Sequence, residues 1–182
     1  MPRADFHAVF DGSMAYADAV RSLTHADAVE LTGEVFDDLD RALADASDAD
    51  VVAIPHDQSA VDAGEQGWNV AHIVAHVTAG LEEAAAQAQT LARGVPVEGR
   101  SRYETPWETL TTADAVRARV AESRRMTTAL LGAWPDAPDL ALTMELVPQF
   151  GPMNAIGRNL LGIMHAAMHP DQLQEALRQA RA

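Results

Sequence analysis

Hydrophobic residues recur at helical spacing in two long stretches of the first half of the chain. In residues 25–46 apolar positions alternate with acidic ones at the period of an α-helix, and Thr24 precedes them as a capping residue. Residues 68–93 carry the clearest apolar stripe, and Gly94 follows it as a stop signal. Each stretch therefore predicts an amphipathic helix.

Two further apolar stripes follow in the second half of the chain. The third begins after Thr112, and Pro135 ends it. The fourth runs from about Asn154 past Pro170, where we expect a kink or a restart because proline lacks a backbone donor and disfavours helical geometry for the preceding residue. Four amphipathic helices bury their stripes best against one another, so we predict an all-α four-helix bundle.

The segments between these helices are long. Residues 47–67 and 94–111 hold Pro and Gly among small polar residues, which predicts long loops or short turns of the kind that often border functional sites. Residues 1–23 predict a short additional helix after an irregular start. Because no linker or internal repeat interrupts the chain, we expect a single domain, with residues 24–182 as the bundle and residues 1–23 as an N-terminal extension packed on it.

The composition narrows the chemistry. Of the 182 residues 48% are hydrophobic but only 5% are aromatic, which favours closely packed helices over a strand-rich fold. The chain has no cysteine, so it can form no disulfide and offers no thiolate ligand. Any bound metal must therefore be held by imidazole, carboxylate or water, and histidine becomes the residue to follow.

The charge and the hydropathy exclude two classes of partner. The formal net charge is −14 and all 13 basic residues are Arg, which argues against nucleic acid because phosphate binding needs clustered cations. No apolar run approaches the roughly 20 residues that cross a bilayer, and no basic, apolar leader opens the chain. We therefore expect a cytoplasmic protein that acts on a small molecule without membrane contact; a homodimer is left open.

The segment HAAMHPDQL carries the first candidate site. His165 and His169 lie four residues apart, so that on one helix both imidazoles reach a single ion. At about 100° per residue both lie at the edge of the core stripe, together with Gln172. Two ordinary half-buried histidines are the alternative interpretation. Gln172 is, in the same way, either a hydrogen-bond partner of a ligand or a plain polar residue at a helix edge.

A second pair of histidines lies on the second predicted helix. His76 falls about 60° from Ile73 at the edge of the apolar stripe, which makes it the better third ligand. His72 points roughly 100° away, which favours an exposed imidazole. A fourth ligand or an acid–base group are the alternatives for His72.

Together the two histidine motifs resemble a known family. GWNVAHIVAHV places Trp68 eight residues before His76, and HAAMHPDQL supplies an HxxxHxxQ pattern near the C-terminus. This order, over roughly residues 24–178, resembles the DinB-like superfamily, also called DinB/YfiT-like, of small four-helix-bundle metalloproteins. In that family the tryptophan packs in the core at the start of its helix.

The resemblance implies a ligand set. It assigns His76, His165 and His169 to one divalent metal and leaves at least one position open for water or substrate. Gln172 matches the glutamine that usually follows these ligands, where it can hydrogen-bond an imidazole or bound water. His72 departs from the pattern, since the family more often has a carboxylate or another polar residue there. Zinc is the first expectation, and nickel, iron or cobalt also suit three imidazoles.

The resemblance also implies an activity. Relatives in the superfamily include S-transferases and isomerases that depend on thiols such as mycothiol or bacillithiol. It therefore implies a metal-dependent S-transferase acting on a small electrophile, before a metal-dependent hydrolase. The alternatives from other classes are a non-catalytic, stress-associated metal-binding bundle and a metal-free interaction module. Several arginines could bind an anionic substrate, although a solvated face is favoured for most of them: Arg100, Arg102, Arg124, Arg125 and Arg158.

Overall fold

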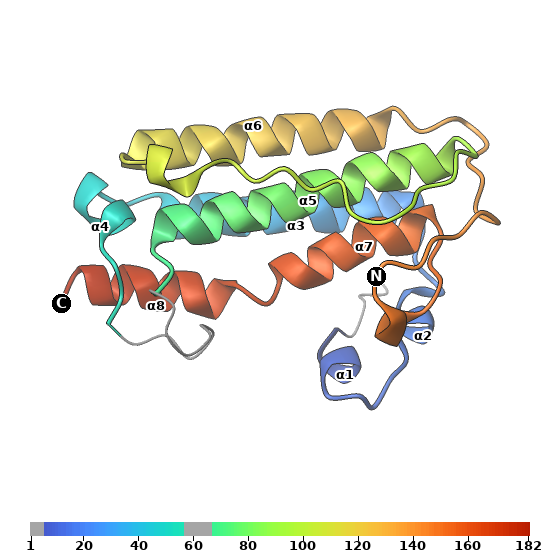
Figure 1. Ribbon diagram of the computed structural model, residues 1–182, viewed down its shortest axis with the longest axis horizontal. Coiled ribbons are helices and arrows are strands. Elements are labelled where there is room, and N and C mark those ends of the chain that lie inside the picture. The colour runs from blue at the N-terminus through green and yellow to red at the C-terminus, as the bar shows by residue number, and fades with distance from the viewer. Residues whose placement is uncertain (1–5, 57–66) are drawn as a thin grey trace.

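The computed structural model describes residues 6–56 and 67–182 and consists of long α-helices joined by irregular segments (Figure 1). The bundle is formed by α3 (His25–Leu43), α5 (Val70–Ala92), α6 (Ala113–Gly132) and a last arm divided into α7 (Ala155–Ala166) and α8 (Pro170–Ala180). Within the described residues the only extended pairing is an isolated antiparallel bridge between Met144 and Met153. The prediction of an all-α bundle is confirmed.

Side-chain caps fix where the long helices begin. Thr24 accepts a hydrogen bond from the backbone of Asp27, whose carboxylate accepts one from the backbone of Thr24, so α3 begins with a capping box. Thr112 caps α6, as its position in the sequence predicts. Helix α5 begins later than predicted because Asn69, and not a residue before Trp68, caps it. Its end agrees with the prediction, since Gly94 adopts a φ of 75°.

The two predicted loops differ in their content. Residues 47–56 include a short helix, α4 (Asp48–Val52), which Ser47 caps; residues 57–66, the remainder of that predicted loop, lie outside the described residues. The segment between α5 and α6 is irregular apart from η1, a single 3-10 turn at Trp107–Thr109. In Figure 1 this segment crosses in front of α5, which brings it over one face of the central helix.

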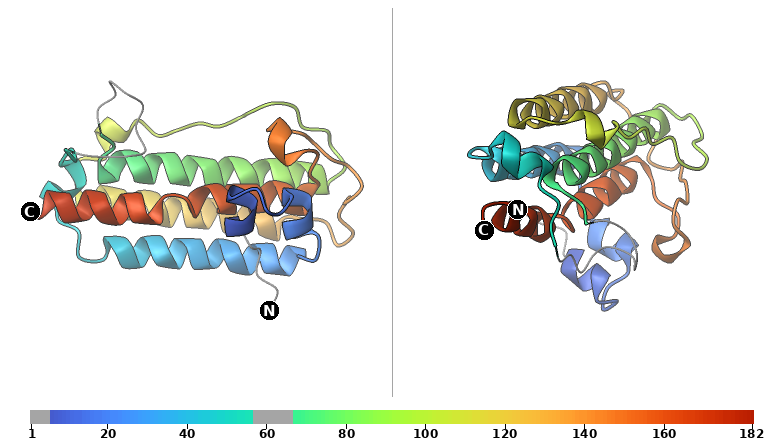
Figure 2. Two further views of the ribbon diagram at one scale, coloured as in Figure 1. Left: turned by 90° about the horizontal axis from the view of Figure 1, so that it is seen from below. Right: turned by 60° about the vertical axis from the view of Figure 1, so that its left-hand side comes forward.

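Helix α5 is the centre of the bundle. It packs against both α6 and α7, and 17 of its residues are buried, as expected of a helix that is apolar on nearly all sides. Helices α5 and α7 run in opposite directions, and both views of Figure 2 show the long helices alongside one another. The α5–α7 interface therefore brings residues from the two histidine motifs together.

The N-terminal segment packs on this bundle outside its long helices. It contains α1 (Phe6–Phe10) and α2 (Tyr16–Val20), followed by α3. Tyr16 is buried, and its hydroxyl donates a 2.5 Å hydrogen bond to the carbonyl of Gly157 in α7. Another short turn, η2 (Pro148–Phe150), supplies Phe150, whose ring lies 5.5 Å from that of Tyr16.

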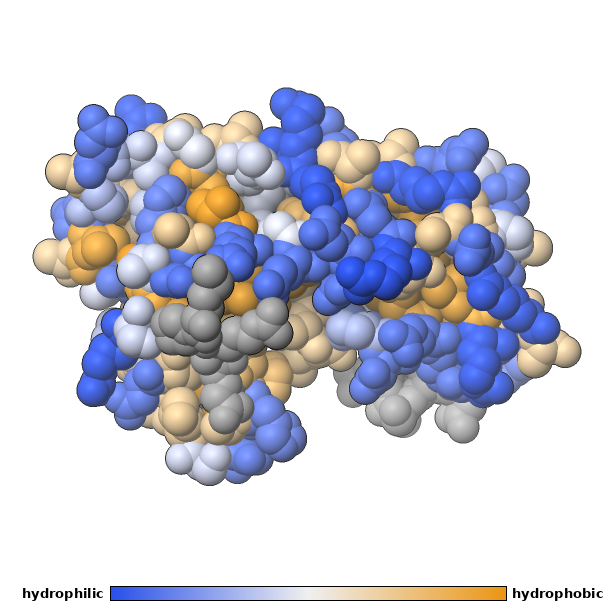
Figure 3. Space-filling model, turned by 180° about the vertical axis from the view of Figure 1, so that it is seen from behind, coloured by the Kyte–Doolittle hydropathy of each residue, from blue (hydrophilic) through white to orange (hydrophobic). Residues whose placement is uncertain are grey.

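The face of the molecule seen from behind is largely polar (Figure 3). In the view from behind, hydrophilic side chains cover most of the face and apolar ones form smaller areas between them (Figure 3). Across residues 6–56 and 67–182, no helix combines the length and the apolar character needed to span a bilayer.

Candidate metal centre

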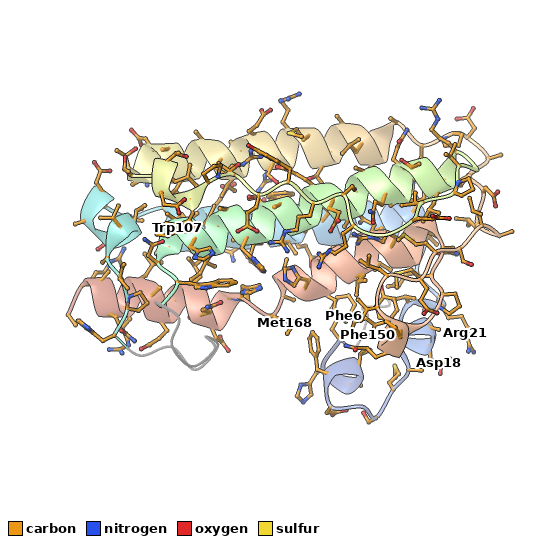
Figure 4. The ribbon with its side chains drawn as sticks, in the orientation of Figure 1. Phe6, Asp18, Arg21, Trp107, Phe150 and Met168 are labelled. Carbon is orange, nitrogen blue, oxygen red and sulfur yellow. The ribbon has the colours of Figure 1, made fainter. Side chains whose placement is uncertain are left out.

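The last arm of the bundle is broken between its two histidines. His165 lies in the last turn of α7, whereas His169 is the residue before α8, with Pro170 at the first position of that helix. Proline is well accepted there because the first helical residue needs no backbone donor. The predicted kink or restart is therefore a restart. Figure 4 shows Met168 at this break.

Three imidazoles meet at the break. The Nε2 atom of His76, in the second turn of α5, lies 3.0 Å from Nε2 of His165, which in turn lies 3.5 Å from Nε2 of His169. One nitrogen from each ring lies within 4.8 Å of the other two. Two nitrogens bound tetrahedrally to one cation at about 2.1 Å are about 3.4 Å apart. The residues present thus fit a divalent metal with three nitrogen ligands.

Burial keeps these imidazoles neutral. Loss of solvent and, after it, the charge of the nearby Arg102 guanidinium lower the pKa of His76 to about 3. Burial likewise lowers the pKa of His165 to about 4, with a contribution from His169. The pKa of His169 is lowered by burial as well. Neutral rings leave nitrogen lone pairs available at pH 7, which is the state that binds metal.

Gln172 lies against one of these rings. Its Oε1 is 2.8 Å from Nδ1 of His169, so the ring N–H at Nδ1 donates to the amide oxygen. The proton on Nδ1 leaves Nε2 of His169 without one. The restart of the helix therefore keeps Gln172 within hydrogen-bonding distance of His169, where it selects the tautomer that directs a bare nitrogen to the cluster.

His72 is not exposed, and this prediction was wrong. Its ring stacks on Trp68 with centroids 4.3 Å apart and on Trp107 of η1 with centroids 5.2 Å apart. The side chain is 23% exposed, and its Nε2 lies 3.9 Å from a carboxylate oxygen of Glu104. Helical-wheel angles cannot reveal this because the covering residue Trp107, labelled in Figure 4, comes from the irregular segment after α5.

Two side chains of that segment reach His76. Arg102 donates through Nη2 to Nδ1 and to the carbonyl of His76, at 2.7 and 2.8 Å. Glu104 accepts from the same Nη2 at 2.6 Å, and its Oε2 lies 3.6 Å from Nδ1 of His76. A recess of about 430 Å³ is lined by these two residues together with His76 and Arg100. Arg102 is 15% exposed, so it does not lie on the solvated face that the sequence favours for most of these arginines. Glu104 had no periodic signal that could reveal it.

A second polar cluster lies farther along the same helix pair. Arg158 of α7 is buried, with Nε donating to Gln87 at 2.7 Å and Nη2 lying 3.4 Å from the carboxylate of Glu83. Its position in the core likewise separates it from the arginines on the solvated face. Glu83 additionally accepts from the backbone of Ser101 at 2.7 Å and from Arg100 at 3.1 Å. This ionic cluster therefore joins α5 and α7 to the irregular segment.

A larger cavity lies on another side of the break. It has a volume of about 550 Å³ and is lined mainly by apolar side chains of α3, α5, α7 and α8, with His169 among its lining residues. One ligand of the candidate centre thus borders an apolar space, whereas His76 borders the polar recess.

Comparison with protein families supports the resemblance seen in the sequence. Residues 30–173 match the model of the DinB superfamily, which is well over half of the chain. Comparisons with curated proteins and with solved structures gave no match. The chain therefore belongs to the DinB superfamily.

Proposed function

We propose that this DinB-superfamily protein is a divalent-metal-dependent enzyme whose cation is held by His76, His165 and His169. The observation that carries the proposal is the convergence of three neutral imidazole nitrogens. Zinc is the first candidate because a three-nitrogen set with an open position is typical of catalytic zinc, and nickel, iron and cobalt are further candidates.

A cation held by neutral imidazoles is a Lewis acid that lowers the pKa of a thiol or water at its open position. The protein residues set the conditions for this chemistry. Burial keeps the three rings neutral, and Gln172 directs Nε2 of His169 toward the other two. The recess beside His76 and the apolar cavity beside His169 offer a reactant two approaches of different polarity.

We further propose transfer of a low-molecular-weight thiol, of the mycothiol or bacillithiol type, to a small electrophile. The thiol sulfur forms a bond to carbon and the leaving group departs with the electron pair of the bond that breaks. The thiol proton passes to solvent, so that thiol and electrophile give a thioether and the protonated leaving group. The proposal rests on family membership and on a site that provides no cysteine nucleophile of its own.

The first experiment measures metal. Protein purified without a metal-affinity tag is analysed for metal per chain, with His165→Ala as the variant and His56→Ala as a control, since His56 lies outside the cluster. The wild type and the control should each bind about one ion, and His165→Ala should lose most of it. A wild type that stays metal-free after incubation with Zn²⁺ or Ni²⁺ would contradict the proposal.

The second experiment tests the thiol. Cobalt-substituted protein is titrated with mycothiol, bacillithiol and glutathione while the absorption band that reports sulfur binding to cobalt is recorded. At least one thiol should produce the band, and turnover of a generic electrophile should follow. A spectrum that no thiol changes, in a protein that metal stabilises but that shows no turnover, would favour the non-catalytic metal-binding bundle.

A further inference from the structure

The irregular segment after α5 places a cation and an anion on the same nitrogen of His76. Arg102 donates to Nδ1 at 2.7 Å, and the Oε2 atom of Glu104 lies 3.6 Å from it. Arg102 also holds Glu104 at 2.6 Å and the His76 carbonyl at 2.8 Å. One ring nitrogen therefore has a donor at hydrogen-bonding distance and a carboxylate acceptor just beyond that distance.

The two partners favour different tautomers of His76. A nitrogen that accepts from Arg102 carries no proton, so in the neutral ring the proton is then on Nε2, the atom that faces His165. A ring that ligates a cation through Nε2 carries its proton on Nδ1, and that N–H needs an acceptor. Arginine has no acceptor atom, whereas the carboxylate of Glu104 is an acceptor.

We propose that Glu104 is a positioning residue for the metal centre, which accepts the Nδ1–H of His76 and so selects the tautomer whose Nε2 binds the cation. Glu104 acts through His76, in the same way that Gln172 acts through His169. The inference rests on the proposed metal site but is independent of thiol transfer.

The ionic cluster fixes the place of this segment. Gln87 donates to the carbonyl of Gly99 at 3.0 Å and to the hydroxyl of Ser101 at 3.2 Å, while Glu83 accepts from the backbone of Ser101. Arg102 follows directly in the chain. Since a buried ion pair seldom adds net stability over an apolar pair of similar size, we assign this cluster the role of anchoring the segment that carries Glu104.

The test compares two glutamates of the same segment. Glu104→Gln and Glu104→Ala are measured against Glu98→Gln, which makes the same charge change at an exposed position. The dissociation constant for Co²⁺ or Zn²⁺ is obtained by competition with a chelator. We expect affinity to fall about 10- to 100-fold for Glu104→Ala and less for Glu104→Gln, which keeps an amide acceptor. The Glu98 variant should match the wild type.

The cobalt spectrum distinguishes a positioning residue from a ligand. The Glu104 variants, once saturated with Co²⁺, should show the visible bands of the wild type because the same three nitrogens bind the ion. His76→Ala should show altered bands or none. Urea unfolding of the metal-free variants should match the metal-free wild type, which would exclude a general loss of folding.

The anchor is tested with Gln87→Met, which keeps the side-chain volume but loses both hydrogen bonds to the segment and the one that Gln87 accepts from Arg158. Gln89→Met is the control, because Gln89 is on the same helix and none of the described contacts to the segment involves it. We expect weaker metal binding for Gln87→Met alone, although Gln87 lies about 16 Å along α5 from His76.

The outcomes separate this inference from the proposed metal site. Wild-type affinity in both Glu104 variants, alongside lost binding in His76→Ala, would overturn the role of Glu104 and leave the metal site intact. A wild type that binds no metal would overturn both. Unchanged affinity in Gln87→Met would overturn the anchoring role alone.

Discussion

The same pair of helices carries two polar clusters of opposite character. His76 faces His165 across the α5–α7 interface, and Glu83 faces Arg158. Seven residues separate the two positions on each helix, which is about two turns or 10 Å. Glu83 and Arg158 are buried in the core, whereas the three histidines are half-buried and His76 borders the polar recess, so the two clusters differ in their side chains and in their surroundings.

The charged groups of the ionic cluster all find partners within the protein, whereas not every nitrogen atom of the histidine cluster does. The carboxylate of Glu83 receives donors from Ser101, Arg100 and Arg158, so its charge is compensated within the protein. In the histidine cluster Nε2–H of His76 donates to Nε2 of His165 at 3.0 Å, so that Nε2 of His165 and Nε2 of His169 both lack protons. These two atoms lie 3.5 Å apart and gain no hydrogen bond from that approach. A polar cluster whose charged groups are all paired, which we call closed, indicates a structural role. A cluster whose nitrogen lone pairs face one another, such as that of His76, His165 and His169, we call open, and it indicates a binding site for a cation.

Breaking the ionic cluster should have the largest effect on stability. Arg158→Ala leaves the buried carboxylate of Glu83 with only the partly exposed Arg100 as a cation. Removal of one partner from a buried pair costs about 3–5 kcal/mol of unfolding free energy. Because Arg100 still pairs with Glu83 in the variant, we expect a loss near the lower end of this range. Urea denaturation measures the loss.

Arg178 provides the control for that variant. It pairs with Glu175 on the surface of α8, and Arg178→Ala should leave the urea midpoint almost unchanged, because exposed ion pairs contribute little. Equal losses in the two variants would mean that the buried cluster has no special role in stability.

The distance between α5 and α7 depends on a close contact at two glycines. A Cβ at Gly162 would overlap Cβ of Ala84, and a Cβ at Gly80 would lie 3.0 Å from Nδ1 of His165. Gly162→Ala should therefore push α7 from α5 and cost about 1–3 kcal/mol of unfolding free energy. It should also weaken metal binding, since both helices supply ligands.

A second substitution can restore the contact. Ala84→Gly removes the methyl group that the new side chain meets, so the double variant should recover most of the lost stability and metal affinity. Gly132→Ala is the control, because a Cβ at Gly132 has no atom within 4 Å. Additive losses in the double variant would show that the contact at Gly162 is not what holds the helices together.

The sequence predicted the open cluster better than the closed one. Helical period places His76, His165 and His169 at the edges of their stripes, and the family pattern joins them. Glu83 and Arg158 belong to helices far apart in the chain, and only packing reveals that they meet. Charged residues are rarely buried, so a solvated face was the expectation for most of the arginines, and nothing in the sequence singled out Arg158.

The hydrophobic periodicity of the sequence could not predict where the irregular segments lie. Caps such as Thr24 and Thr112 have local signals, and the structure confirms both. Glu104 and Trp107 come from a segment without a period, whose position depends on contacts made by Ser101 and its neighbours. The helical wheel predicted on which side of α5 the His72 ring lies, but it could not predict that Trp107 packs against that side.

Acid should destabilise the metal-free protein because His76 and His165 of the open cluster are held neutral in the folded state. The unfolded chain takes up protons at histidine below a pH of about 6.5, whereas burial keeps the pKa of His76 at about 3 and that of His165 at about 4 in the folded state. Below 6.5 the unfolded state binds more protons, so the free energy of unfolding falls as the pH falls. Above pH 7 both states are neutral at these rings and the effect vanishes.

Urea midpoints of metal-free protein at pH 8, 6.5 and 5 measure this dependence. The double variant His76→Gln/His165→Gln should show a flatter profile over the same range, since the side chains that take up protons in the unfolded state are gone. A wild-type midpoint that stays level or rises toward pH 5 would mean that these rings are not held neutral by burial.

The smallest effect on metal binding is expected at His72, which lies beside the open cluster without belonging to it. Its ring is enclosed by Trp68 and Trp107, and the group of converging ligand atoms contains His76, His165 and His169 but not His72. His72→Ala should therefore keep nearly all of the metal while losing about 0.5–1.5 kcal/mol from each stacked pair that the ring forms. His72→Phe, which restores an aromatic ring without a nitrogen ligand, should recover part of that stability and bind metal as the wild type does. If both variants lost metal as completely as His76→Ala, His72 would be a metal ligand. Its role would then not be limited to stacking between Trp68 and Trp107.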